Sequence, residues 1–211
     1  RARLQRRGIQ WKSCALRGGV LSPPLMIGER GGLHVGSVTW RGAEILLDYL
    51  SCSVRESNRS TLRTLELGSG TGLLGVGLAA VCGDDVTLTD RDGIELLEAT
   101  VARNAALIDT ACGAARVVRL DWCDEGSMSA ARFDRVVGAD ILYNASCVEP
   151  LLRTIVALIP PEDCKTLFYL CYKVRERDAE AQFFTRLLAE GFTTCDVLEK
   201  VEEHTLYRIH R

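Results

Sequence analysis

The sequence predicts an α/β fold in which a mostly parallel sheet carries helices on both faces. From about residue 40 onward, short β-rich segments alternate with segments of helical periodicity. A glycine cluster at 68–72 follows the first of these strands and opens a helix, as at the carboxyl edge of such a sheet. The last two strand-like segments are joined only by residues 199–203. Because this linker is too short for a helical crossover, we expect these two strands to pair antiparallel.

Residues 1–38 precede the regular pattern and are rich in Gly, Arg and Pro. Six basic residues come before the first acidic residue, Glu29. These basic residues are Arg1, Arg3, Arg6, Arg7, Lys12 and Arg17. A remnant of an organelle-targeting segment and a solvated arm both have this composition. We favour an arm or early strand that contributes to partner binding, and we predict an N-terminal arm over 1–38 and one domain over 39–211.

The domain itself reads as alternating helices and strands. Apolar residues between Ala43 and Leu50 lie on one face of a helix, and the polar residues 51–60 predict a loop. Asp92 is the expected N-cap of a long helix whose apolar stripe runs from Ile94 to Ile108. Further helices are predicted over 73–82, 148–155 and 179–187. The seven predicted strands are 62–67, 85–89, 116–120, 132–139, 166–172, 193–198 and 205–209.

The composition fits a single domain with a sizeable core. Of the 211 residues, 47% are hydrophobic and 26% are charged, which is an ordinary globular balance. The net charge of −2 argues against electrostatic capture of nucleic acid by the whole surface. No apolar run approaches the roughly 18 residues of a membrane span. We therefore expect neither stable nucleic-acid binding nor membrane insertion.

The nine cysteines are scattered along the chain and include no C-x-x-C pair. An odd number of cysteines without metal-ligand spacing favours free thiols over a disulfide framework or a zinc site. His34, His204 and His210 lack metal-ligand spacing as well. The sequence therefore predicts no metal, and a reducing compartment, the cytoplasm or the nucleus.

The strongest local signal is the segment Leu-Glu-Leu-Gly-Ser-Gly-Thr-Gly at 65–72. Gly68, Gly70 and Gly72 have the spacing G-x-G-x-G, whereas a dinucleotide fingerprint needs G-x-G-x-x-G and a Walker P-loop needs G-K-[ST]. Glu66 at the strand end disfavours a pyrophosphate, because like charges repel, and suits a ligand with an ammonium group. The pattern predicts a nucleoside-like ligand close to the glycine backbone.

Two further strand ends supply candidate contacts to a nucleoside. Asp90 ends the second predicted strand, where a carboxylate can accept hydrogen bonds from both ribose hydroxyls. Asp121 can accept a hydrogen bond from the amino group of adenine, and Trp122 can cover the ring. A simple turn at Asp90 and a core position for Trp122 are the structural alternatives.

With these elements the sequence resembles the seven-strand methyltransferases that depend on S-adenosylmethionine. The resemblance runs from about Trp40 to the end of the chain. It implies a Rossmann-like, seven-stranded, mostly parallel sheet with a reversed last strand, and S-adenosylmethionine as the cofactor. The residues that it implies around the cofactor are Trp40, Glu66, Gly68, Gly70, Gly72, Asp90, Asp121, Trp122 and Ala139.

A narrower resemblance follows the fourth predicted strand, where Asp140 and Tyr143 form a D-x-x-Y motif. This motif is similar to that of the DxxY group, methyltransferase family 16, whose members methylate lysines in non-histone proteins. Agreement continues at Asn104 and at Tyr-Lys-Val-Arg over 172–175. The Pro-Pro-aromatic sequence typical of enzymes that methylate amino groups of nucleic-acid bases is missing after Asp140. The glutamate pair typical of arginine methyltransferases is missing as well, so both classes are disfavoured.

The resemblance implies an in-line methyl transfer, for which the protein positions the donor and a neutral acceptor amine. A lysine amine has a pKa of about 10.4 in water, and a dry channel lowers that pKa. Tyr143 would hold the alkylated amine by a cation–π contact. Asp140 would orient the ammonium or bind elsewhere on cofactor or substrate. A capping role for Asp140 and core packing for Tyr143 are the structural alternatives.

The sequence therefore predicts a monomeric protein-lysine methyltransferase whose substrate is a protein such as a chaperone, a translation factor or an ATPase. Two alternatives stay open. One is a methyltransferase for another acceptor: a histidine or arginine side chain, a small molecule or RNA. The other is a non-catalytic adaptor that keeps the fold and binds a partner. The intact glycine cluster together with Asp90, Asp140 and Tyr143 favours an enzyme.

Overall fold

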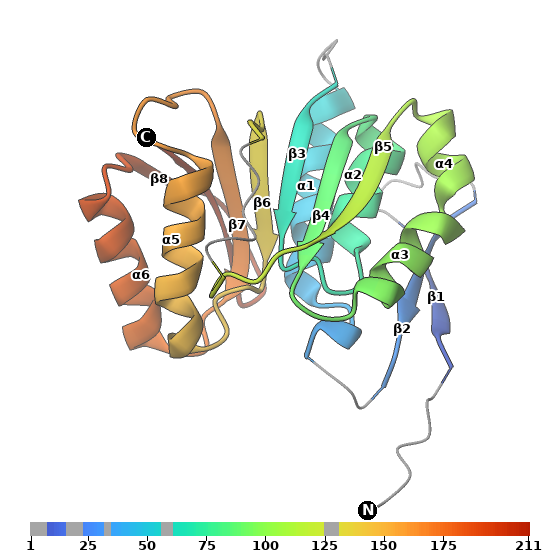
Figure 1. Cartoon of the computed structure of the whole chain (residues 1–211), viewed down its shortest axis with the longest axis horizontal. Helices are drawn as coiled ribbons and strands as arrows, with labels where there is room; N and C mark the ends of the chain where they lie inside the picture. The colour runs from blue at the N-terminus through green and yellow to red at the C-terminus, as the bar shows by residue number, and fades with distance from the viewer. Residues whose placement is uncertain (1–7, 16–22, 32–34, 56–60, 125–130) are drawn as a thin grey trace, which may run out of the picture.

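The computed structural model describes residues 8–15, 23–31, 35–55, 61–124 and 131–211. Within them lie a two-stranded sheet and a seven-stranded sheet (Figure 1). The strands are β1 (Gln10–Cys14), β2 (Leu25–Glu29), β3 (Arg63–Leu67), β4 (Asp85–Asp90), β5 (Ala114–Arg119), β6 (Arg135–Ala139), β7 (Leu167–Lys173), β8 (Thr194–Val201) and β9 (His204–His210). The helices are η1 (Val35–Ser37), α1 (Arg41–Arg55), α2 (Leu73–Cys82), α3 (Ile94–Arg103), α4 (Ala105–Thr110), η3 (Ala145–Cys147), α5 (Val148–Leu158) and α6 (Arg177–Ala189).

The large sheet has the strand order β5-β4-β3-β6-β7-β9-β8. The five strands from β5 to β7 are parallel, and β9 lies antiparallel between β7 and β8. The chain moves outward from β3 to β5 and then returns to β6 on the other side of β3. In open α/β sheets ligands bind at such a switch point, beyond the carboxyl ends of the strands. The predicted fold class, including the reversed last strand, is confirmed.

Helices cover both faces of this sheet (Figure 1). Val136 and Val137 are adjacent on β6 and are both fully buried, yet they belong to different core clusters. Leu170 and Cys171 divide in the same way on β7. A strand with helices on both faces reads as a continuous apolar run, because successive side chains enter opposite layers. This pattern explains why the central strands could be placed from the sequence.

The β1–β2 hairpin packs on the domain instead of forming a separate arm. Leu25 and Ile27 of β2 are fully buried in the core cluster that also contains α1 and α2. Asn104 fixes the strand, because Met26 N donates to Asn104 Oδ1 at 2.9 Å and Asn104 Nδ2 donates to Met26 O at 2.8 Å. The boundary predicted between residues 38 and 39 therefore falls inside the folded unit. Arg1, Arg3, Arg6, Arg7 and Arg17 lie outside the described residues.

Two predicted helices differ from the observed ones. Helix α1 continues to Arg55, whereas the sequence predicts a loop from residue 51. The helix expected from 94 to 108 is divided at Asn104, whose side chain bonds to β2 and to Thr100 O. Gly93, with φ 70°, is the N-cap of α3, so the prediction of Asp92 as the cap was wrong. Among the described helices, none has the length and apolarity that crossing a membrane requires.

Candidate functional site

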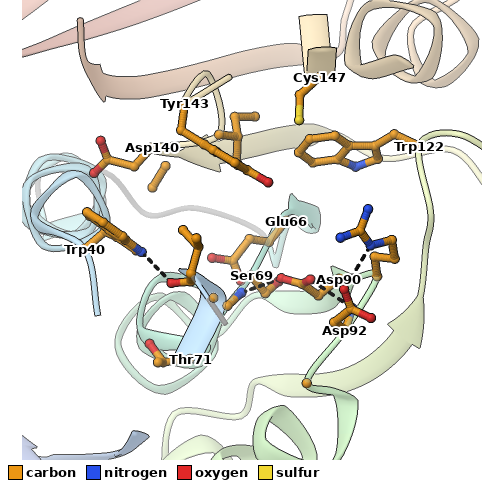
Figure 2. A pocket seen from close by; sticks show the side chains of 18 of the residues that line it. Trp40, Glu66, Ser69, Thr71, Asp90, Asp92, Trp122, Asp140, Tyr143 and Cys147 are labelled. Atoms are coloured by element: carbon orange, nitrogen blue, oxygen red, sulfur yellow. Dashed lines mark hydrogen bonds and ion pairs between the residues drawn. The ribbon is translucent and has the colours of Figure 1, made fainter. Parts of the chain in front are cut away.

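A cavity of about 330 Å³ lies beyond the carboxyl ends of β3, β4 and β6 (Figure 2). Small-molecule sites span roughly 300–1,000 Å³, so the cavity is large enough for a nucleoside. All predicted site residues except Gly72 line it. In Figure 2, Tyr143 and Trp122 lie along one side of the cavity, and Ser69 and Asp90 lie along the opposite side. The strand ends that the sequence singled out therefore meet in one place.

The turn after β3 brings its backbone against η1. Gly68 and Gly70 have φ values of 64° and 55°, in the left-handed region that favours glycine. A Cβ on Gly70 would lie 3.2 Å from the carbonyl oxygen of Gly36, so a side chain there would press on η1. Gly72 is instead the N-cap of α2, and a Cβ on it would lie 2.6 Å from Leu97 Cδ1. Its φ of 84° and the close approach of Leu97 both favour glycine at the start of α2.

Asp90 holds the glycine turn from the end of β4. Its Oδ2 accepts a hydrogen bond from Gly70 N at 2.8 Å, and its Oδ1 accepts one from Asp92 N at 3.2 Å (Figure 2). Burial raises the pKa of the Asp90 carboxyl above its ordinary value, and these N–H donors oppose the rise. The carboxylate and the glycine turn therefore touch directly at the cavity wall.

Glu66 lies deeper, on the face of β3 that packs against α2. It is 2% exposed, and its Oε2 accepts a hydrogen bond from Gly75 N at 3.1 Å. Desolvation raises the pKa of Glu66 to about 8, although donors from Ser69 and Gly75 oppose the rise. A Cβ on Gly75 would lie 2.4 Å from Glu66 Oε2, so only glycine leaves room for this carboxyl group. A buried acid of this kind regains its charge most easily beside a cation.

The side of the cavity opposite Ser69 and Asp90 is aromatic, with Trp122 and Tyr143 (Figure 2). The ring of Trp122 approaches the backbone of Gly68, where a Cβ would lie 3.4 Å from Trp122 Cζ2. Asp121 Oδ1 accepts a hydrogen bond from Cys123 N at 2.9 Å. Tyr143 is 39% exposed, and burial together with Cys147 raises the pKa of its phenol above the ordinary value. The phenol is therefore neutral in the physiological range.

Trp40 forms the wall nearest to α1. Its Nε1 donates to the carbonyl oxygen of Val35 at 2.9 Å, and the ring is 37% exposed (Figure 2). The guanidinium carbon of Arg175 lies 4.8 Å from the centroid of the ring. Trp40 is thus held by the N-terminal segment on one side and by the residues after β7 on the other.

The carboxylate of Asp140 points toward the start of α1 and away from the ring of Tyr143 (Figure 2). Its Oδ2 accepts a hydrogen bond from Gly42 N at 2.9 Å, and its Oδ1 accepts from Lys173 N at 3.3 Å. Arg175 Nη2 lies 3.3 Å from Oδ1. In this geometry Asp140 caps α1 and joins it to β7. The two roles predicted from the sequence, orienting the substrate ammonium or binding elsewhere on cofactor or substrate, stay predictions.

Sequence reasoning missed one wall of the cavity. Val35, Gly36, Ser37 and Val38 line it, although the sequence assigned them to the N-terminal arm. No motif marks these residues, because their role depends on tertiary contact with the glycine turn and Trp40. Arg91, Asp92 and Cys147 also line the cavity and were not predicted as site residues. For Arg91 and Asp92 the signal was their position directly after Asp90.

Comparison with known proteins adds the family. A family model described as lysine methyltransferase matches residues 21–190. The match begins before β2, in agreement with the burial of that strand in the core.

Individual relatives point the same way. The chain is 35% identical over 164 residues to a protein named EEF1A lysine methyltransferase 3 from Mus musculus, covering 76% of this chain and 65% of that protein. It is 33% identical over 168 residues to protein N-lysine methyltransferase METTL21A from Mus musculus, covering 78% and 72%. The crystal structure of the ribosomal protein L11 methylase from Lactobacillus delbrueckii subsp. bulgaricus matches with a TM-score of 0.54 at 17% identity, covering 79% of this chain and 78% of that chain. At this identity the structural match supports the fold alone.

Proposed function

Because the chain belongs to the lysine methyltransferase family whose model matches residues 21–190, we propose that it transfers a methyl group from S-adenosylmethionine to a lysine side chain of a non-histone protein. The observation that carries this proposal is the meeting of Glu66, Asp90 and Trp122 around one cavity. These side chains come from three different strand ends of the sheet. Together they offer an acid for a cation, a carboxylate for a ribose and a flat surface for a purine.

The residues around the cavity fit S-adenosylmethionine. The carboxylate of Asp90 keeps acceptor capacity beyond its two backbone bonds, and the indole of Trp122 provides a face on which adenine stacks. Burial raises the pKa of Glu66, and a ligand ammonium beside it would supply a counter-charge for its ionised form. When bound, S-adenosylmethionine supplies an electrophilic methyl group on a sulfonium.

The acceptor side has to present a neutral amine in line with that methyl group. Tyr143 supplies an aromatic wall that holds an alkylated amine by cation–π contact. Trp40, which the resemblance placed beside the cofactor, also lines the cavity, and we propose that it forms a second wall for the amine. An apolar channel between them disfavours the ammonium form of lysine and lowers its pKa from about 10.4. Asp140 acts by fixing α1 and the residues after β6, not as a base, because its oxygens are bonded to the protein.

The names of the relatives suggest the class of substrate. One relative is named for EEF1A, so a translation elongation factor is our first candidate acceptor. We also propose that the protein works as a monomer, and that it works in the cytoplasm or the nucleus. The nine free cysteines support the compartment, because thiols persist in a reducing environment.

Two measurements test the proposal. Calorimetric titration with S-adenosylmethionine should give a one-to-one complex, and folded protein that binds none would favour an adaptor. Cell lysate is then incubated with the protein and methyl-labelled cofactor, and the labelled products are mapped by mass spectrometry. Methyl-lysine in a non-histone protein is the expected product. Label in RNA, in a small molecule or on another side chain would overturn the proposed acceptor.

A further inference from the structure

Arg175 lies two residues after β7, outside the residues that line the cavity, yet it contacts two residues that do. Its Nη2 lies 3.3 Å from Asp140 Oδ1, and its guanidinium carbon lies 4.8 Å from the centroid of the Trp40 ring. A guanidinium this close to an indole face makes a cation–π contact. One side chain therefore links the residue after β6 to the residue before α1.

Trp40 depends on contacts of this kind for a fixed orientation. Its indole edge is held by one hydrogen bond, from Nε1 to the carbonyl oxygen of Val35. Val35 is itself 53% exposed, so this acceptor lies in a solvated segment. A hydrogen bond at the ring edge leaves rotation about its own axis open, whereas a planar group stacked on the ring face removes that freedom.

Asp140 in turn anchors Arg175. The Asp140 side chain is 3% exposed and receives N–H donors from Gly42 and Lys173. His204 Nε2 lies 3.5 Å from Asp140 Oδ2. Because α1, β7 and β9 each contribute a contact to this carboxylate, the guanidinium that pairs with it has a defined position. A continuous line of contacts thus leads from the buried core to the indole at the cavity wall.

We propose that Arg175 is a positioning residue for methyl transfer: it stacks on Trp40 and, anchored by Asp140, fixes the aromatic wall against which the acceptor amine is held. The inference rests on the proposed function. Arginine is required for this role, since a lysine ammonium keeps the positive charge near Asp140 but cannot stack as a plane.

A double-mutant cycle tests the role of Arg175. The substrate is the lysate protein that the wild-type enzyme labels. Initial rates of its methylation are measured with the wild type, with Arg175→Gln, Arg175→Lys and Trp40→Ala, and with the two double variants that combine Trp40→Ala with each change at Arg175. We expect Arg175→Gln and Arg175→Lys to lower kcat/KM about 3- to 30-fold, the range of a cation–π contact. In the Trp40→Ala background, either change should have no further effect. Full additivity would overturn the proposal, because it would mean that Arg175 acts without Trp40.

Arg103→Gln is the matched control. The guanidinium carbon of Arg103, on α3, lies 5.7 Å from the centroid of the Trp11 ring. Trp11 belongs to the N-terminal hairpin, and neither residue lines the cavity. Removal of Arg103 also takes one cation–π contact from the protein, yet it should leave the rate of methyl transfer within twofold of the wild type. An equal loss in both arginine variants would mean that the rate follows general stability.

A readout without substrate separates this inference from the proposed function. The fluorescence of Trp40 is obtained by subtracting the emission of the Trp40→Phe protein from that of the protein with Trp40. Acrylamide should quench this fluorescence more strongly when Arg175 is replaced by glutamine. If the wild type labels no lysine but this quenching increases, the proposed function fails and the positioning role stands. If the wild type labels lysine, but Arg175→Gln leaves the quenching of Trp40 unchanged and the cycle shows no coupling between Arg175 and Trp40, the positioning role fails.

Discussion

Replacing Glu66 by glutamine should change how the stability of the fold depends on pH. The side chain is 2% exposed under α2, and burial raises its pKa to about 8 from the ordinary 4.5. A raised pKa means that the folded state binds the proton more tightly than the unfolded chain does. The stabilisation is complete below pH 4.5 and is lost as the pH rises to about 8. At most about 5 kcal/mol is involved, since each unit corresponds to about 1.4 kcal/mol.

The Glu66→Gln variant keeps an acceptor for Gly75 N but has no proton to lose. Urea unfolding of both proteins at pH 5, 7 and 9 gives the difference in the free energy of unfolding, which isolates the titration of this one group. We expect the variant to gain on the wild type by several kcal/mol between pH 5 and pH 9. Glu98→Gln, an exposed change on α3, is the control and should show no such gain. A difference that stays constant with pH would refute the assigned pKa of Glu66.

Three further predictions follow from contacts at the site and its supports. Asp90→Ala should weaken S-adenosylmethionine binding by about 1–3 kcal/mol, measured calorimetrically, and unchanged affinity would contradict the ribose assignment. Gly75→Ala should destabilise the fold by about 1–3 kcal/mol in urea unfolding, because its Cβ would lie 2.4 Å from Glu66 Oε2. Asn104→Ala should expose the β1–β2 hairpin to proteolysis, since the side chain holds Met26 by two hydrogen bonds; a protected hairpin would refute this.

Those parts of the molecule that local chemistry determines could be predicted from the sequence. The apolar runs of β6 and β7 follow from burial on both faces of the sheet. The glycine cluster and the acid at position 90 could be placed together, because both follow parallel strands whose carboxyl ends meet at one edge. The short linker before β9 was enough to predict its reversal.

The remaining features depend on contacts between distant segments. Asn104 lies within an apolar helical stripe, so nothing local indicates that its amide binds a strand 78 residues away. Residues 35–38 carry no motif, and they become a cavity wall only because Gly70 permits their close approach. The direction of the Asp140 carboxylate was open for the same reason, since its partners come from α1 and from β7.

The backbone at Asp140 gives the D-x-x-Y spacing a physical meaning. Asp140 has φ 53°, a left-handed conformation that aspartate tolerates better than most residues. This turn sends its carboxylate back to the N-terminus of α1, where Gly42 N donates to it and the helix dipole favours a negative charge. The chain then continues through Ile141, which is 3% exposed and packs against Gly138, before Tyr143 reaches the cavity. The spacing therefore separates an acid that fixes the architecture from an aromatic ring that lines the cavity, and the two residues belong to one turn.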